Sequence, residues 1–132
     1  MSKSKGNVIE IGMDADTTAK LVKRAVTDSD RFITYDPENR PEVSNLVMLA
    51  ALCTGRDPLE VAAEVGNGGG GGLKKLVTES VNEFFAPIRA KRTELAADPG
   101  YLLDVLRKGN AHANEVGDAT LAEVRAAMNM VY

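Results

Sequence analysis

Apolar residues recur along this 132-residue chain at spacings of three and four, the period of an amphipathic α-helix. The first such run predicts a helix over residues 15–26, with Asp14 or Asp16 available as its N-cap. A second run opens at Pro41 and is apolar at almost every position over residues 43–54. Because so little of it is polar, we expect this second helix to be the central rod of the core.

A short third helix is predicted between Asp57 and Gly66, because Asp57 is followed by a proline and glycine favours the end of a helix. Asn67 and the five consecutive glycines 68–72 come directly afterwards. Glycine loses more backbone entropy on ordering than any other residue. We therefore expect residues 66–72 to form a mobile loop.

Two long helices are predicted in the second half of the chain. One reaches about residue 96, is expected to kink at Pro87, and carries an apolar stripe made of Leu73, Leu76, Val77, Val81, Phe84, Phe85 and Ile88. The other begins at Asp98 and Pro99, and its predicted buried side contains Leu102, Val105, Leu106, Ala113, Val116, Leu121, Val124 and Met128. No internal repeat and no alternating strand pattern of useful length is visible, so the predicted fold is all-α, a helical bundle.

Composition narrows the class of protein. A length of 132 residues suits one compact domain, and the 44% hydrophobic and 27% charged fractions are those of a soluble globular chain. Neither a secretory signal nor a membrane-spanning window is present, so we expect a cytoplasmic protein. The net charge of -3 argues against a broadly basic surface for nucleic acid, so any RNA contact must be local.

Several reactive or polar residues have a structural interpretation. Cys53, the single cysteine, lies beside an apolar run and is expected to pack as a small hydrophobe. The lone His112 has no neighbouring cysteine or second histidine, so no metal site is expected. Ser44 and Asn45 are expected to bond to loop backbone near the start of the most apolar helix.

The first residues carry a short motif. Met1, Ser2, Lys3 and Ser4, with Gly6 and Asn7 after them, resemble the KMSKS loop of class I aminoacyl-tRNA synthetases without its leading lysine. The sequence after the motif is similar in order and spacing to bacterial tryptophanyl-tRNA synthetases at residues 25–29, 35–37, 41, 43–46, 73–75, 87–89, 97–99 and 121–125. The glycine run departs from the family, whose members carry a more mixed loop there. The resemblance implies a KMSKS-type loop and connector at residues 1–13 and a helical anticodon-binding domain at residues 14–132.

The resemblance implies a catalytic role for Lys3, which occupies the position that stabilises the pyrophosphate of ATP. A flexible ammonium can follow negative charge that builds on a leaving phosphate, and Ser2 and Ser4 would add hydroxyl donors at the same ATP-binding loop. The family's catalytic domain would precede residue 1. ATP, with Mg²⁺, is therefore expected only in the full enzyme, and the chain by itself is expected to be inactive.

The resemblance also implies that tRNA(Trp) is the partner, together with the missing catalytic domain. It places anticodon contacts at the turn after the first helix and at the start of a later helix, which gives Asp30, Arg31, Lys74 and Lys75. Arg31 and Lys74 suit splayed bases or their phosphates, and Asp30 suits a base edge. The alternative interpretation of these four residues is an ordinary solvated turn and helix start.

Two other functions stay open at this point. The chain could be a free-standing relative of the synthetases, starting at Met1 and acting as a tRNA- or protein-binding regulatory module. It could also be a helical scaffold that has lost RNA binding and pairs only with another protein.

Overall fold

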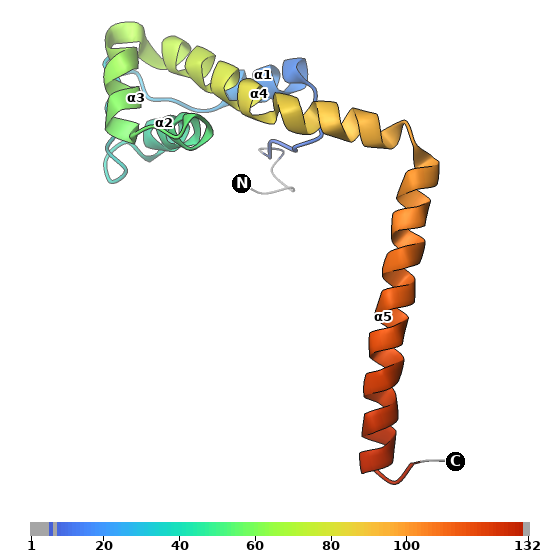
Figure 1. The fold of residues 1–132 in the computed structure, drawn as a ribbon. Helices are drawn as coiled ribbons and strands as arrows, with labels where there is room; N and C mark the ends of the chain where they lie inside the picture. The colour runs from blue at the N-terminus through green and yellow to red at the C-terminus, as the bar shows by residue number, and fades with distance from the viewer. Residues whose placement is uncertain (1–5, 7, 131–132) are drawn as a thin grey trace. The chain divides into compact units, whose positions relative to one another are not determined.

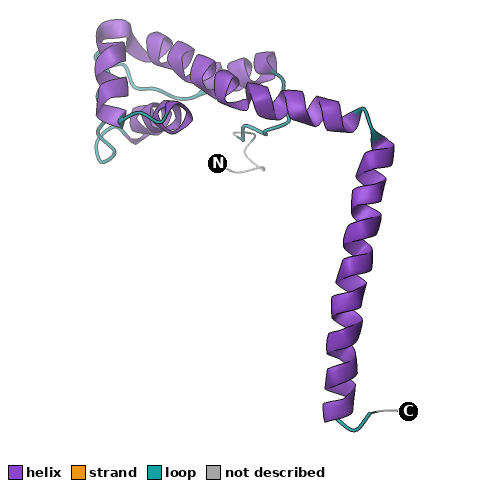
Figure 2. Ribbon diagram, in the orientation of Figure 1, coloured by secondary structure: helices purple, strands orange, loops and turns teal. Residues whose placement is uncertain are grey.

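A computed structural model describes residue 6 and residues 8–130. Met1, Ser2, Lys3 and Ser4 of the motif lie outside the described residues. The elements in chain order are α1 (Ala15–Arg24), α2 (Pro41–Thr54), α3 (Pro58–Val65), the 3₁₀ helix η2 (Gly66–Gly68), α4 (Gly69–Ala96) and α5 (Pro99–Ala127) (Figure 1). No strand occurs in this part of the chain, which confirms the all-α prediction (Figure 2).

Short local signals set the helix boundaries. Asp14 caps α1, accepting a 2.7 Å hydrogen bond from the Thr17 amide, and Asp57 caps α3 in the same way. Gly55 ends α2 in the left-handed conformation, with a φ of 69° that glycine adopts without steric strain. Asp98 accepts from the Tyr101 amide at 2.9 Å at the start of α5. These predicted boundaries are confirmed to within two residues.

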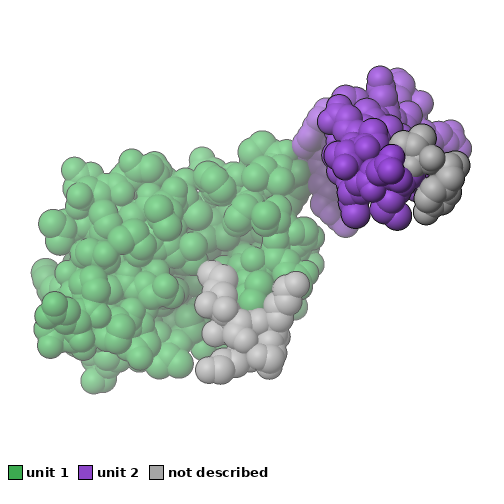
Figure 3. Space-filling view, turned by 90° about the horizontal axis from the view of Figure 1, so that it is seen from below, with its two compact units in different colours: residues 1–90 green, residues 91–132 purple. Residues whose placement is uncertain are grey.

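The chain divides into two compact units, Met1–Ala90 and Lys91–Tyr132 (Figure 3). The boundary falls within α4, which therefore contributes residues to both. The hydrophobic core lies in the first unit. It consists of Val22, Ile33, Val43, Leu46, Val47, Ala50, Ala51, Val61, Ala62, Leu73, Val77 and Val81. Five of these twelve belong to α2, so α2 is the central rod that its apolar sequence predicted.

Polar contacts join α1 to α4 inside the first unit. The fully buried Thr18 donates its hydroxyl to the Asp14 carbonyl at 2.9 Å and accepts from Nη2 of Arg89 at 3.0 Å. Asn82 accepts from Nη1 of Arg89 at 2.8 Å and donates to the Ala15 carbonyl at 3.2 Å. These bonds give the buried Thr18 hydroxyl two partners and tie the two helices together.

The prediction of a mobile glycine loop is wrong, because residues 66–68 form η2 and residues 69–72 form the first turn of α4. The glycines lie close to other segments. A methyl group on Gly70 would come within 2.7 Å of the Thr27 hydroxyl, and Leu73, one residue after the run, is fully buried. Tertiary packing therefore outweighs the poor helix propensity of glycine.

The predicted buried side of α5 is also wrong. Every residue of α5 is exposed, including its large apolar residues, from Leu102 at 39% to Leu106 at 61%, and nothing lies within 4 Å of the positions that side chains would take at Gly109 and Gly117. On α4, Phe84 and Ile88 are exposed although the rest of the predicted stripe is buried or half-buried. None of the described helices is long and apolar enough to cross a lipid bilayer.

Candidate functional site

The segment between α1 and α2 is shaped by Arg40, the residue that precedes α2. Its side chain is 13% exposed. Nε and Nη2 of Arg40 donate to the two carboxylate oxygens of Asp28, both at 2.7 Å. This two-point pairing is the strongest geometry available to an arginine and a carboxylate. It fixes the position of Asp28 against the start of α2.

The same guanidinium reaches other parts of residues 28–34, a segment that we call the 28–34 loop. Nη1 of Arg40 donates to the Phe32 carbonyl at 2.7 Å and to the Thr34 hydroxyl at 2.9 Å. Nη2 also lies 3.5 Å from the Asp30 carbonyl. One side chain therefore holds acceptors along the whole length of the loop.

The charges of this cluster shift the acid–base equilibria of its members. The hydrogen bond from Arg40 lowers the pKa of Asp28, and the same bond raises the pKa of Arg40. Hydrogen bonds from Asn39 lower the pKa of Asp36. Near neutral pH the carboxylates of Asp28 and Asp36 are therefore ionised, and Asp28 faces the guanidinium cation of Arg40.

Asp30, which the sequence predicted to accept bonds from a base, already has partners within the loop. Its Oδ1 accepts from the Phe32 amide at 3.1 Å, and its Oδ2 lies 3.9 Å from Nη1 of Arg40. The side chain is nevertheless 64% exposed. Asp30 thus helps to shape the loop and still presents carboxylate surface to solvent.

Arg31 connects the loop to the entry of α4. Its Nε donates to the Asn67 carbonyl at 3.1 Å, and the next residue but one, Ile33, donates its amide to the Gly66 carbonyl at 2.8 Å. Gly69 lies beneath Arg31, where a methyl group would meet the Arg31 Cγ at 3.6 Å. The exposed Arg31 side chain is therefore docked on the turn that leads into α4.

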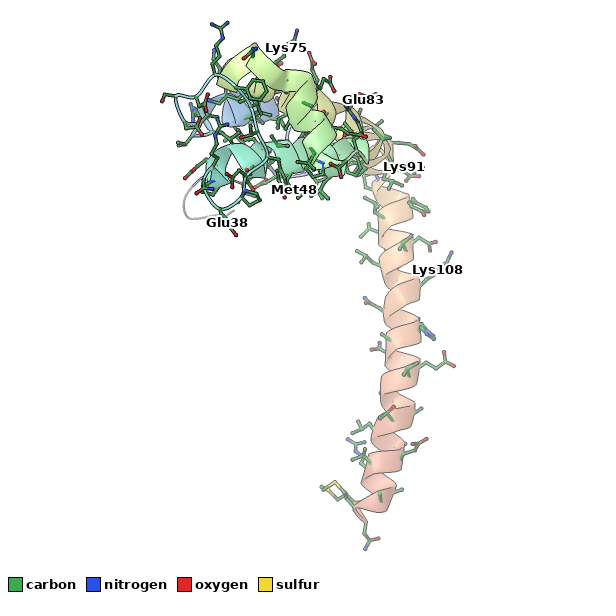
Figure 4. All side chains as sticks on the ribbon, turned by 90° about the vertical axis from the view of Figure 1, so that its left-hand side faces the viewer. Glu38, Met48, Lys75, Glu83, Lys91 and Lys108 are labelled. Atoms are coloured by element: carbon green, nitrogen blue, oxygen red, sulfur yellow. The ribbon has the colours of Figure 1, made fainter. Side chains whose placement is uncertain are left out.

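Lys74 and Lys75 follow on the second turn of α4. Lys74 is half-buried, whereas Lys75 is exposed and lies 4.0 Å from the Glu79 carboxylate (Figure 4). Lys74 is five residues after Gly69, which is about 7.5 Å along a helix that rises 1.5 Å per residue. The two segments predicted to contact RNA, although more than forty residues apart in sequence, therefore lie in one region of the first unit.

Arg40 and Asn67 are the members of this region that sequence reasoning missed. Arg40 stands next to a helix-starting proline and follows several acidic residues, which was the available signal. Asn67 contributes a backbone carbonyl, which its residue type does not reveal. Ser44 accepts from the Asp36 amide at 2.9 Å, so its predicted bond to loop backbone is confirmed, whereas Asn45 is exposed.

The remaining candidate chemistry is sparse. Among residue 6 and residues 8–130, no three His, Cys, Asp or Glu side chains are grouped closely enough to hold a metal ion. His112 is exposed on α5, 4.0 Å from the Glu115 carboxylate. Cys53 packs against the core, and burial raises the pKa of its thiol. The predicted ATP-binding residues Ser2, Lys3 and Ser4 lie outside the described residues.

Comparison with known proteins addresses the family directly. The model of the family "tRNA synthetases class I (W and Y)" matches residues 1–86. Tryptophan–tRNA ligase 1 of Streptomyces coelicolor is 40% identical over 89% of this chain and 34% of its own length. The tryptophan–tRNA ligases of a Nostoc species and of Corynebacterium glutamicum are 42% and 39% identical over 86% and 94% of this chain.

The chain spans about a third of the length of these curated relatives, 34% to 37%. The family match covers well over half of the chain and agrees with the resemblance carried by the residues after the motif. The chain belongs to the class I tRNA synthetases of the tryptophan and tyrosine (W and Y) family.

Proposed function

We propose that this chain is the C-terminal portion of a bacterial-type tryptophan–tRNA ligase and that its first unit binds the anticodon of tRNA(Trp). The relatives named above are tryptophan–tRNA ligases, and the likeness runs through most of this chain. Residues 14–132 would form the helical anticodon-binding domain, and residues 1–13 the KMSKS-type loop and connector.

The observation that carries the proposal is the docking of Arg31 on the entry to α4. The Arg31–Asn67 bond and the Ile33–Gly66 bond bring the guanidinium of Arg31 to the helix that presents Lys74 and Lys75. Single-stranded RNA loops are read by cationic and hydrogen-bonding side chains that reach splayed bases and their phosphates. Because the chain as a whole carries a net charge of -3, this local group of cations suits one confined RNA contact.

The proposed ATP chemistry belongs to the complete enzyme. Lys3 would act on the pyrophosphate of ATP, with Ser2 and Ser4 as additional donors, when a catalytic domain holds the nucleotide and its Mg²⁺ opposite them. By itself the chain would bind tRNA and would not aminoacylate it. Its place of work would be the cytoplasm, where the ribosome uses charged tRNA.

The test is binding of the chain to tRNA(Trp) and to the same tRNA with a changed anticodon, at one fixed salt concentration. Salt is fixed because phosphate contacts respond steeply to it. We expect tighter binding to the natural anticodon, and we expect Arg31→Ala to reduce this preference by roughly tenfold, the value of one good base contact. Lys74→Ala should weaken binding as well.

The control is Lys108→Ala, which removes a cation from the exposed surface of α5. It should leave the preference between the two RNAs unchanged. Equal binding of both RNAs by the unmodified chain, or an unchanged preference in the Arg31→Ala and Lys74→Ala variants, contradicts the proposed anticodon contacts.

A further inference from the structure

We propose that Arg40 is a positioning residue for RNA recognition: it holds the 28–34 loop in the conformation that presents Arg31 beside the entry to α4. This inference rests on the proposed function of the loop. Arg40 would not touch the RNA itself, because its side chain is 13% exposed and its nitrogens are turned toward Asp28, Phe32 and Thr34.

The first argument is that the loop has few other attachments. The described residues between α1 and α2 form no helix, and Ile33 is the one residue of the 28–34 loop that is buried in the hydrophobic core. Apart from the bonds to Arg40, the Ile33 amide donates to Gly66 and the Arg31 Nε donates to Asn67. The Asn67 bond uses only Nε of Arg31, so the other guanidinium nitrogens can reach an RNA base or phosphate while that bond is kept. Ile33 anchors the middle of the loop in the core, and Arg40 would be the side chain that holds the residues on either side of it in shape.

The second argument concerns geometry. The carboxylate of Asp28 accepts two parallel bonds, while Nη1 of the same guanidinium serves Phe32 and Thr34. A lysine carries the same charge, but its ammonium is a single point and cannot span these acceptors in one plane. The shape of the loop therefore depends on the planar fork of an arginine, and charge alone would not maintain it.

The third argument is that Arg40 is not needed to start α2. Its side chain makes no capping hydrogen bond to that helix, which instead begins with Pro41 in the first position. The core residues of α2 are apolar and buried, and the bonds of the guanidinium described above all go to the 28–34 loop. Loss of the fork should therefore loosen the loop and leave the helical core folded.

A loop that is already ordered loses less conformational entropy when it binds. Arg40 would thus raise the preference for the natural anticodon without contributing a contact of its own. The test uses Arg40→Lys in the complete chain. The matched control is Arg56→Lys, which alters an exposed ion pair with Glu64 away from the loop.

Two measurements are made on both variants. The first is the ratio of affinities for tRNA(Trp) and for the same tRNA with a changed anticodon. The second is hydrogen exchange at the amides of Phe32, Ile33 and Val47. For Arg40→Lys we expect the affinity ratio to fall by roughly tenfold, the scale of one lost charge-assisted contact, with faster exchange at Phe32 and Ile33. The exchange at Val47, in the core, should stay as it is, and Arg56→Lys should change none of these values.

Unchanged affinity ratio and unchanged exchange in Arg40→Lys would overturn the inference. If Arg40→Lys unfolds the chain, the same two measurements are made on Asp28→Asn instead. This variant weakens the two bonds between Arg40 and residue 28 and keeps the arginine. If the unmodified chain does not distinguish the two RNAs, the proposed function fails and the recognition role of Arg40 fails with it. The amide exchange still shows separately whether Arg40 holds the loop.

Discussion

Single charged residues of the 28–34 loop should make the stability of the first unit depend on pH. Arg40 lowers the pKa of Asp28 in the folded chain, so the folded state favours the ionised carboxylate. This stabilisation is complete above the ordinary carboxyl pKa of about 3.9 and is lost as the pH falls through the lower folded value. Urea unfolding of Asp28→Asn from pH 2 to 6 should show a smaller loss of stability on acidification than the unmodified chain.

The control for this pH experiment is Asp118→Asn, on the exposed surface of α5. Its acid profile should follow that of the unmodified chain. Identical profiles for all three proteins would mean that the Arg40–Asp28 pair does not persist in solution.

Thr18 offers a test of the polar contacts between α1 and α4. Its buried hydroxyl bonds to the Asp14 carbonyl and to Arg89. Thr18→Val keeps the shape and removes both bonds, so we expect unfolding to become easier by about 1–3 kcal/mol in urea titrations. The control is Thr120→Val, because Thr120 makes the same bond to its own helix on exposed α5. Similar changes in both variants would contradict a special role for the buried hydroxyl.

At the level of helices, local signals predicted most boundaries, and packing decided the rest. Asp57 and Pro58 start α3, and Gly55 ends α2 in the left-handed conformation. Each of these signals acts on residues within one helical turn, so it can be recognised from the sequence alone. The glycine run was misjudged because its helix depends on contacts with Thr27 and Arg31, some forty residues away. Arg40 escaped notice for a different reason: its partners lie only 6 to 12 residues away, but in an irregular loop no regular spacing shows which of them the guanidinium meets.

Neighbouring glycines of α4 should respond in opposite directions to the same substitution. Nothing lies within 4 Å of a methyl group at the exposed Gly71, so Gly71→Ala should stabilise the chain by about 0.5–1 kcal/mol. Gly70→Ala would place its methyl 2.7 Å from the Thr27 hydroxyl and 3.3 Å from its Cβ, so it should destabilise the chain by about 1–3 kcal/mol. Thermal or urea unfolding of both variants measures the difference.

A double variant isolates the cause. Thr27→Ala removes the hydroxyl that meets the new methyl, so Gly70→Ala should be less harmful in the Thr27→Ala background. Equal effects of Gly70→Ala in both backgrounds would show that the contact with Thr27 is not responsible.

At the scale of the whole molecule, the two units differ in the amount of buried apolar surface that can stabilise their folded state. The first contains the hydrophobic core, whereas none of the described residues of the second is buried. The apolar spacing in α5 identified which side chains share a face, but spacing does not say whether anything covers that face. An isolated helix has little stability in water without packing. The backbone amides of α5 should therefore exchange hydrogen much faster than those of α2.

This comparison needs no substitution, because α2 serves as the internal reference. Both helices are long, and both are followed in one exchange experiment on the same sample. Equal protection of α5 and α2 would show that the apolar residues of α5 are covered in solution.

The bonds between α1 and α4 have a consequence for synthesis on the ribosome. The bond from Asn82 to Ala15 spans 67 positions of the chain, and the bond from Arg89 to Thr18 spans 71. At a translation rate of about 5–20 residues per second, α1 leaves the ribosome roughly 3–14 seconds before its partners leave it. During that interval Thr18 and Val22, which are buried at the end, face solvent or a chaperone. Codons that slow translation between α1 and α4 would lengthen the exposure, so the speed of synthesis matters most within this stretch of the gene.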